Sequence, residues 1–202
     1  MLECIAFGQV ANFKTNSNIE IEKWPIALNT YLKKSIRIIN AEEVSEKFHS
    51  RYNCKKKKYR YVINNSRFGT ALFRNMEYNF NQELNIEDMK KAVKFFEGEH
   101  DFKAFKASGT SSKSSVRTIY KAEIKRQGDR IYIELTGNGF LYNMVRIISG
   151  TLVDVGIGKI KPDEITEIIE SKKRERAGKT LPPQGLYLIN VEYWFNFLLM
   201  IL

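Results

Sequence analysis

The residues of this chain best suited to chemistry are the cations and tyrosines of residues 48–62, FHSRYNCKKKKYRYV. Four consecutive lysines cannot all lose their water, so they must lie in solvent or against a polyanion. The alternation from Tyr59 to Val62 is typical of a β-strand with two different faces. Cations at one end would bind RNA phosphates, and a tyrosine ring would stack on an unstacked base. A solvated loop entering a half-buried strand explains the same residues equally well.

The candidate phosphate-binding residues of this stretch are Arg51, Lys55, Lys56, Lys57, Lys58 and Arg60. A second candidate, Arg146, lies within the largely apolar residues 140–155. Such an arginine needs a buried carboxylate or a pocket to compensate for its lost water. The alternative is that its side chain extends to the surface.

Other polar residues receive structural interpretations. We expect structural hydrogen bonds from His49 and His100, and a cap or turn role for Asp101. Asp154 ends an apolar segment, and no partner for it is evident from the sequence. Cys4 and Cys54 lack the spacing of a metal site or a disulfide framework, so no metal is predicted and a reducing cytoplasm is expected.

The composition indicates a globular protein with a polyanionic partner. The chain has 202 residues, 43% of them hydrophobic, which suffices for one sizeable core or two small lobes. Its net charge of +10 favours nucleic acid over a membrane, although a basic enzyme of another kind has the same property. No apolar run approaches the ~20 residues of a membrane helix, and the first residues lack the features of a signal peptide.

The elements expected to position these residues are mixed strands and helices, which indicates an α+β fold around an antiparallel or mixed sheet. Besides the basic strand, period-two patterns predict strands over residues 8–15, 35–41, 116–126, 130–136 and 186–193. Helical spacing and capping residues predict helices over residues 19–32, 84–96, 140–155 and 162–171.

Several blocks in order carry a resemblance beyond these local patterns. With the basic stretch they are GQVANF, EGEHDFKAF, RTIYKAEI, GNGFLYNMVRIISGTLVDVG and PPQGLYLINVEY. Over residues 6–193 the chain resembles the bacterial tRNA pseudouridine synthase A family. The resemblance implies a mixed, largely antiparallel sheet flanked by helices in two similar lobes. It also implies isomerisation of uridine to pseudouridine in the anticodon stem-loop of tRNA, by a cytoplasmic homodimer without a cofactor.

The resemblance also implies roles for individual residues. In the family an aspartate attacks the flipped-out nucleotide, and the base detaches, rotates and rejoins through carbon. Tyr59 matches the tyrosine that stacks on the target base. Arg146 matches the arginine that pairs with the aspartate and orients it.

The start of the chain departs from the family pattern. The family has a Gly-Arg-Thr-Asp-Ala-Gly-Val-His block before the strand that starts here at Gly8, whereas this chain has Met1-Leu2-Glu3-Cys4-Ile5. Counting back from Tyr59 without gaps places the catalytic aspartate at Met1. We therefore expect an N-terminally truncated or frameshifted member in which Arg146 is buried without a partner. Its parts would be an incomplete first lobe (residues 1–68), a C-terminal lobe (69–193) and an apolar tail outside the family pattern (194–202).

Three hypotheses follow for the function. The chain is a tRNA pseudouridine synthase, a catalytically inactive tRNA-binding module of the same fold, or an unrelated basic α+β protein. The first two predict salt-sensitive binding to tRNA and the third does not.

Overall fold

The computed structural model describes residues 4–109 and 114–193, and the predicted tail at 194–202 lies outside them. These residues form an α+β fold with a mostly antiparallel sheet of order β1-β7-β2-β6-β5-β4, and β3 pairs with β2. The pairs β1/β7 and β2/β3 are parallel. The strands are β1 (Ile5–Ala6), β2 (Cys54–Asn64), β3 (Tyr78–Asn79), β4 (Gly98–Asp101), β5 (Val116–Gln127), β6 (Arg130–Gly137) and β7 (Leu186–Tyr193).

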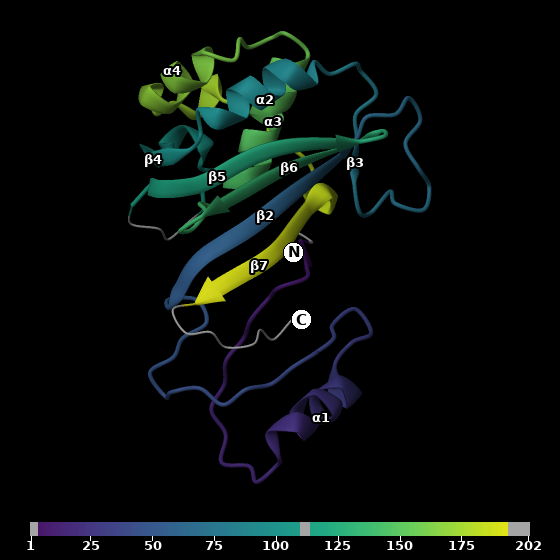
Figure 1. The fold of residues 1–202 in the computed structure, drawn as a ribbon, viewed down its shortest axis with the longest axis vertical. Helices are drawn as coiled ribbons and strands as arrows, with labels where there is room; N and C mark the ends of the chain where they lie inside the picture. The colour runs from purple at the N-terminus through teal and green to yellow at the C-terminus, as the bar shows by residue number, and fades with distance from the viewer. Residues whose placement is uncertain (1–3, 110–113, 194–202) are drawn as a thin grey trace.

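Of the α-helices in the described residues, α2, α3 and α4 lie together beside the sheet, while α1 lies at the far end of the long axis (Figure 1). The helices are α1 (Trp24–Tyr31), α2 (Ile86–Lys94), α3 (Met144–Gly156) and α4 (Glu164–Ser171). Single 3-10 turns occur at Ile21–Lys23, Phe102–Phe105, Arg174–Arg176 and Pro183–Gly185. Among the described residues, none of these helices has the length and apolar character to cross a membrane.

Local chemistry explains where α2 begins. The Asn85 side chain accepts a hydrogen bond from the backbone N–H of Asp88, and two acids occupy the first turn. This is the arrangement that satisfies free N–H groups at a helix start. Met89, Ala92 and Val93 form the buried face of α2, as their spacing predicts.

The core lies between the helices and one face of the sheet. Strand β2 contributes Tyr61 and Ile63 to it, and β6 contributes alternate residues including Ile133 and Leu135. Every residue of α3 is buried. Because α3 packs on β2, the N-terminal end of α3 comes close to the tyrosines of the central strand.

The predicted strands at residues 8–15 and 35–41 are wrong, because both segments are irregular in the structure. Neither pairs with another strand, and a period-two pattern alone cannot supply the missing inter-strand hydrogen bonds. The predicted helix at 19–32 is reduced to a 3-10 turn and α1, which has no buried residue. The division at residues 68/69 stays a prediction. Strand β2, from the first part, pairs with β6 and β7 of the second.

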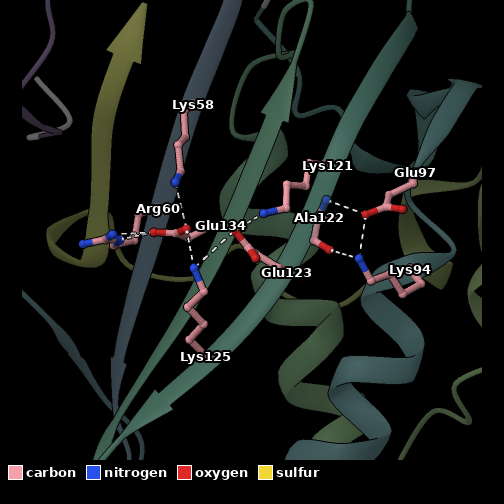
Figure 2. Close-up of polar contacts among 9 residues, drawn as sticks. All are labelled: Lys58, Arg60, Lys94, Glu97, Lys121, Ala122, Glu123, Lys125 and Glu134. Carbon is pink, nitrogen blue, oxygen red and sulfur yellow. Dashed lines mark hydrogen bonds and ion pairs between the residues drawn. The ribbon is translucent and has the colours of Figure 1, made fainter.

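The face of β2 opposite the helices carries a group of charges around Glu134, which we call the Glu134 cluster (Figure 2). The Glu134 side chain is only 3% exposed. Its Oε2 lies 2.9 Å from Lys58 Nζ and 3.7 Å from Lys125 Nζ. Arg60 Nε donates to Glu134 Oε1 at 2.7 Å. Burial alone would raise the pKa of Glu134, but Lys58 and Arg60 outweigh it and lower the pKa from 4.5 to about 2.

We expect the Glu134 cluster to make stability depend on acid pH. The carboxylate has a lowered pKa in the folded state, so its contribution is complete above about pH 4.5 and is lost as the pH falls toward about 2. Unfolding by denaturant should therefore show a stability advantage over Glu134→Gln that is largest near pH 6 and shrinks between pH 4.5 and 2. A constant difference over this range would contradict the ion pairing.

Candidate active site

A pocket of about 290 Å³ opens where the N-terminal end of α3 meets β2. Its lining includes Tyr59, Phe140, Asn143, Arg146, Pro183 and Leu186. The structure thus brings together Tyr59 and Arg146, the two residues singled out for the substrate and the chemistry. They are 87 positions apart in the sequence.

Tyr59 is a half-buried aromatic side chain at the edge of the core. Its ring meets Phe140 edge to face, with a centroid separation of 5.2 Å and an interplanar angle of 79°. Burial, then the neighbouring Cys4 and Cys54, raises the pKa of Tyr59 to about 12. The hydroxyl of Tyr59 therefore keeps its proton well above physiological pH.

Arg146 is buried, with 7% of its surface exposed, so the alternative that it extends into solvent is wrong. Its Nε donates to the Leu181 carbonyl oxygen at 2.6 Å, and its Nη1 donates to Asn143 Oδ1 at 2.9 Å. Burial lowers the pKa of Arg146, while Tyr61 and Tyr142 oppose this effect. An arginine nevertheless keeps its proton in proteins, so a guanidinium cation borders the pocket.

The expectation that Arg146 has no partner is also wrong, because two acceptors hold its guanidinium. Both acceptors are neutral, one a backbone carbonyl and the other a side-chain amide. Of the described residues that line the pocket, none has a carboxylate. The positive charge of Arg146 is thus oriented but not neutralised there.

The backbone around Arg146 explains how these acceptors reach it. Asn143 precedes α3 with φ of 59°, a left-handed conformation that asparagine tolerates better than most residues. Gly150 lies directly against the Lys179 carbonyl, where a Cβ atom would overlap the oxygen. This close approach lets the chain pass beside α3, and Leu181 N–H then donates to the Arg146 carbonyl at 3.3 Å.

The proline-rich turn that precedes β7 closes the pocket on another side. The Tyr61 hydroxyl donates to the Pro182 carbonyl at 2.6 Å. At Gly185 a Cβ atom would come within 2.8 Å of the Tyr61 ring, so only glycine allows this approach without displacement. The turn thereby places Pro183 and Leu186 in the pocket wall.

The candidate RNA-binding cations do not all lie on one surface. Arg51 lies in a turn and sits over the Tyr52 ring at 5.8 Å. The four lysines, predicted to be a rim in solvent or against a polyanion, lie within β2. Lys56, Lys58 and Arg60 make ion pairs with glutamates, and Lys55 makes further contacts of its own.

Sequence reasoning missed Phe140, Asn143 and the Leu181 carbonyl. Asn143 lies inside the helix predicted over residues 140–155, whereas α3 begins after it, at Met144. The enrichment of asparagine in left-handed positions was the signal that could have moved the predicted start. Leu181 acts through its backbone at a separation of 35 residues, and its side-chain type says nothing of this.

The remaining polar candidates make local contacts. His49 Nδ1 accepts from Arg51 N–H at 3.1 Å, and His100 Nε2 lies 2.9 Å from the Glu97 carbonyl oxygen. Asp101 caps a 3-10 turn, and Asp154 has an ion-pair partner, Lys159, at 3.5 Å. Within the part of the chain that the structure describes, no three His, Cys, Asp or Glu side chains are placed to hold a metal ion.

Comparisons with known proteins show the family of the chain. The sequence pattern of the tRNA pseudouridine synthase family matches residues 92–194. Proteins called tRNA pseudouridine synthase A from Thermoanaerobacter sp. (strain X514) and Acetivibrio thermocellus are 53% and 52% identical over 188 residues. These matches cover 93% of this chain and 77% of each relative. The Bacillus subtilis protein of that name is 46% identical, with 93% and 76% covered. The chain therefore belongs to the tRNA pseudouridine synthase family.

Proposed function

We propose that this chain supplies the base-binding part of an enzyme that converts uridine to pseudouridine in the anticodon stem-loop of tRNA. The observation that carries the proposal is the shared pocket of Tyr59 and Arg146, in which the arginine is buried yet held only by neutral acceptors. A site for a flipped base needs an aromatic platform, and a site for a nucleophilic carboxylate needs a positioned cation.

Tyr59 would receive the target base. A base must leave its stack before its glycosidic bond can be attacked, which costs a few kcal/mol. Stacking on an aromatic ring returns about 1–3 kcal/mol per base. The edge-to-face contact with Phe140 holds the Tyr59 ring in place, so little side-chain entropy is lost when the base arrives.

Arg146 would orient the nucleophile. A carboxylate of the substrate-attacking aspartate would pair with the free charge of the guanidinium, whose Nε and Nη1 are already engaged by Leu181 and Asn143. The glycosidic bond between the sugar carbon and N1 breaks, the base turns, and a C–C bond forms between the same sugar carbon and carbon 5. Carbon 5 then loses its proton, and N1 gains one, so the atoms balance. Substrate and product are isomers, so the reaction has no net oxidant or reductant, in keeping with the family's lack of a cofactor.

The proposed nucleophile is the aspartate of the family's Arg-Thr-Asp block, whose position falls at Met1. The described residues that line the pocket provide no carboxylate to replace it. This observation favours a second candidate function for the 202-residue chain by itself, namely tRNA binding without isomerisation. For the complete protein we propose a homodimer that acts in the cytoplasm.

Tyr59 variants test the platform. Tyr59→Phe should bind tRNA nearly as well as the parent, because the ring face is retained, whereas Tyr59→Ala should lose about 1–3 kcal/mol of binding. Filter binding with an unmodified tRNA transcript measures both. Equal losses in the two variants would show that the hydroxyl, not the ring, makes the contact.

Arg146 and the nucleophile are tested together. The chain alone should release no tritium from tRNA labelled at carbon 5 of uridine, and an N-terminally extended chain carrying the Arg-Thr-Asp block should release it. In the extended chain, Arg146→Met should stay folded and lose about 100-fold or more in rate, because a cation that acts on the reacting groups is removed. Arg146→Lys, which keeps the charge without the fork, is the control.

Turnover by the 202-residue chain would refute the assignment of the nucleophile to the Arg-Thr-Asp block. An Arg146→Met variant with near-parental rate would refute the role of the arginine.

A further inference from the structure

The pleat of β2 divides the basic run between two surfaces. Successive side chains of a strand point to opposite faces, and the β2/β6 register is unbroken from Lys57 to Asn64. Tyr59, Tyr61 and Ile63 pack on the helix side. Lys57 therefore lies on the Tyr59 face, and Lys58 and Arg60 lie on the other.

The face opposite Tyr59 carries its own counter-charges (Figure 2). Lys58, Arg60 and Lys125 surround Glu134. Lys121 and Lys125 lie 2.9 Å and 3.4 Å from Glu123. These cations belong to β2 and β5, the two strands that flank β6. Each of them has a carboxylate within ion-pair distance.

Aromatic rings engage two cations of the same face. Arg60 lies over the Tyr132 ring at 5.2 Å, and Lys56 lies over the Tyr120 ring at 5.5 Å. Lys56 also lies 3.8 Å from Glu192. An RNA phosphate that recruited Lys58 or Arg60 would have to leave Glu134, which is 3% exposed, with fewer partners in a poorly solvated place.

Lys57 is in a different situation. Among the residues that the structure describes, no carboxylate lies within ion-pair distance of it. It lies two residues before Tyr59 in β2, on the same face of the strand. A phosphate next to a base stacked on Tyr59 would meet this lysine without breaking an ion pair.

We propose that Glu134 is a specificity-determining residue that withdraws Lys58 and Arg60 from RNA, so that β2 contacts the tRNA backbone only on the Tyr59 face, through Lys57. This inference rests on the proposed function, since it requires that the chain bind tRNA. Glu134 thereby prevents a second, unproductive RNA-binding surface on the other side of the central strand.

The first experiment compares Lys57→Gln with its neighbour Lys58→Gln in the 202-residue chain. Both changes remove one positive charge from the same strand, so the variants differ in the face of β2 and in the ion pair that Lys58 makes with Glu134. Binding of an unmodified tRNA transcript is measured by filter retention over a salt series. Lys57→Gln should lower the slope of log K against log salt by about one unit, with an unchanged thermal midpoint. Lys58→Gln should keep the slope and lower the thermal midpoint.

The second experiment compares Glu134→Gln with Glu97→Gln. The probe is poly(U), an RNA that lacks the folded structure of tRNA. Both variants gain one unit of net charge. Among the described residues, Glu97 forms an ion pair with Lys94 of α2 and accepts a hydrogen bond from the Ala122 N–H of β5, so its contacts lie away from β2. Glu134→Gln should bind poly(U) more tightly and with a steeper salt slope, since two or three cations are released, and Glu97→Gln should not. Circular dichroism checks that each variant is folded. If Glu134→Gln does not fold, the comparison of Lys57→Gln with Lys58→Gln tests the proposal by itself.

Equal slope losses for Lys57→Gln and Lys58→Gln would overturn the proposal, as would equal poly(U) gains for the two glutamate variants. Absence of salt-sensitive tRNA binding by the unaltered chain would instead overturn the proposed function itself.

Discussion

The alternation of side chains along β2 is the constraint on which the rest of the structure depends. This strand lies inside the sheet, between β7 and β6, and its two faces meet different surroundings. One face contributes Tyr61 and Ile63 to the core under α3, and the other carries cations that need counter-charges. A shift of one residue would place lysines in the core and tyrosines among the glutamates. Both the pocket and the Glu134 cluster thus rely on one register.

Arg146 shows how a buried cation can be hydrogen-bonded without neutralisation of its positive charge. A buried carboxylate partner within the fold would satisfy it but would also cancel its field. Neutral acceptors from Leu181 and Asn143 fix the direction of the guanidinium and leave its charge in place. Such a preoriented charge in a poorly solvated pocket acts strongly on an anion that enters. The closely packed crossing at Gly150 is what brings the Leu181 carbonyl within reach.

Sequence reasoning predicted the elements that local chemistry determines. The cap at Asn85, the hairpin of β5 and β6, and β7 are all found where capping, turn and period-two patterns put them. It failed for residues 8–15, because strand formation depends on a partner that no local pattern reveals. It named Tyr59 and Arg146 through the family resemblance. Sequence reasoning could not predict that Glu134, 74 residues from Arg60, pairs with cations of the basic stretch at residues 48–62.

The left-handed backbone at Asn143 restricts which residue types fit at this position. Few side chains tolerate a φ of 59°, and asparagine, aspartate and glycine are the ones that do so most readily. Glycine would release Nη1 of Arg146, and aspartate would put a resident anion 2.9 Å from it, in competition with any carboxylate that enters the pocket. Asparagine alone among these three is both an acceptor and uncharged. Position 143 therefore has two physical requirements, a left-handed backbone and an uncharged acceptor, and asparagine meets both.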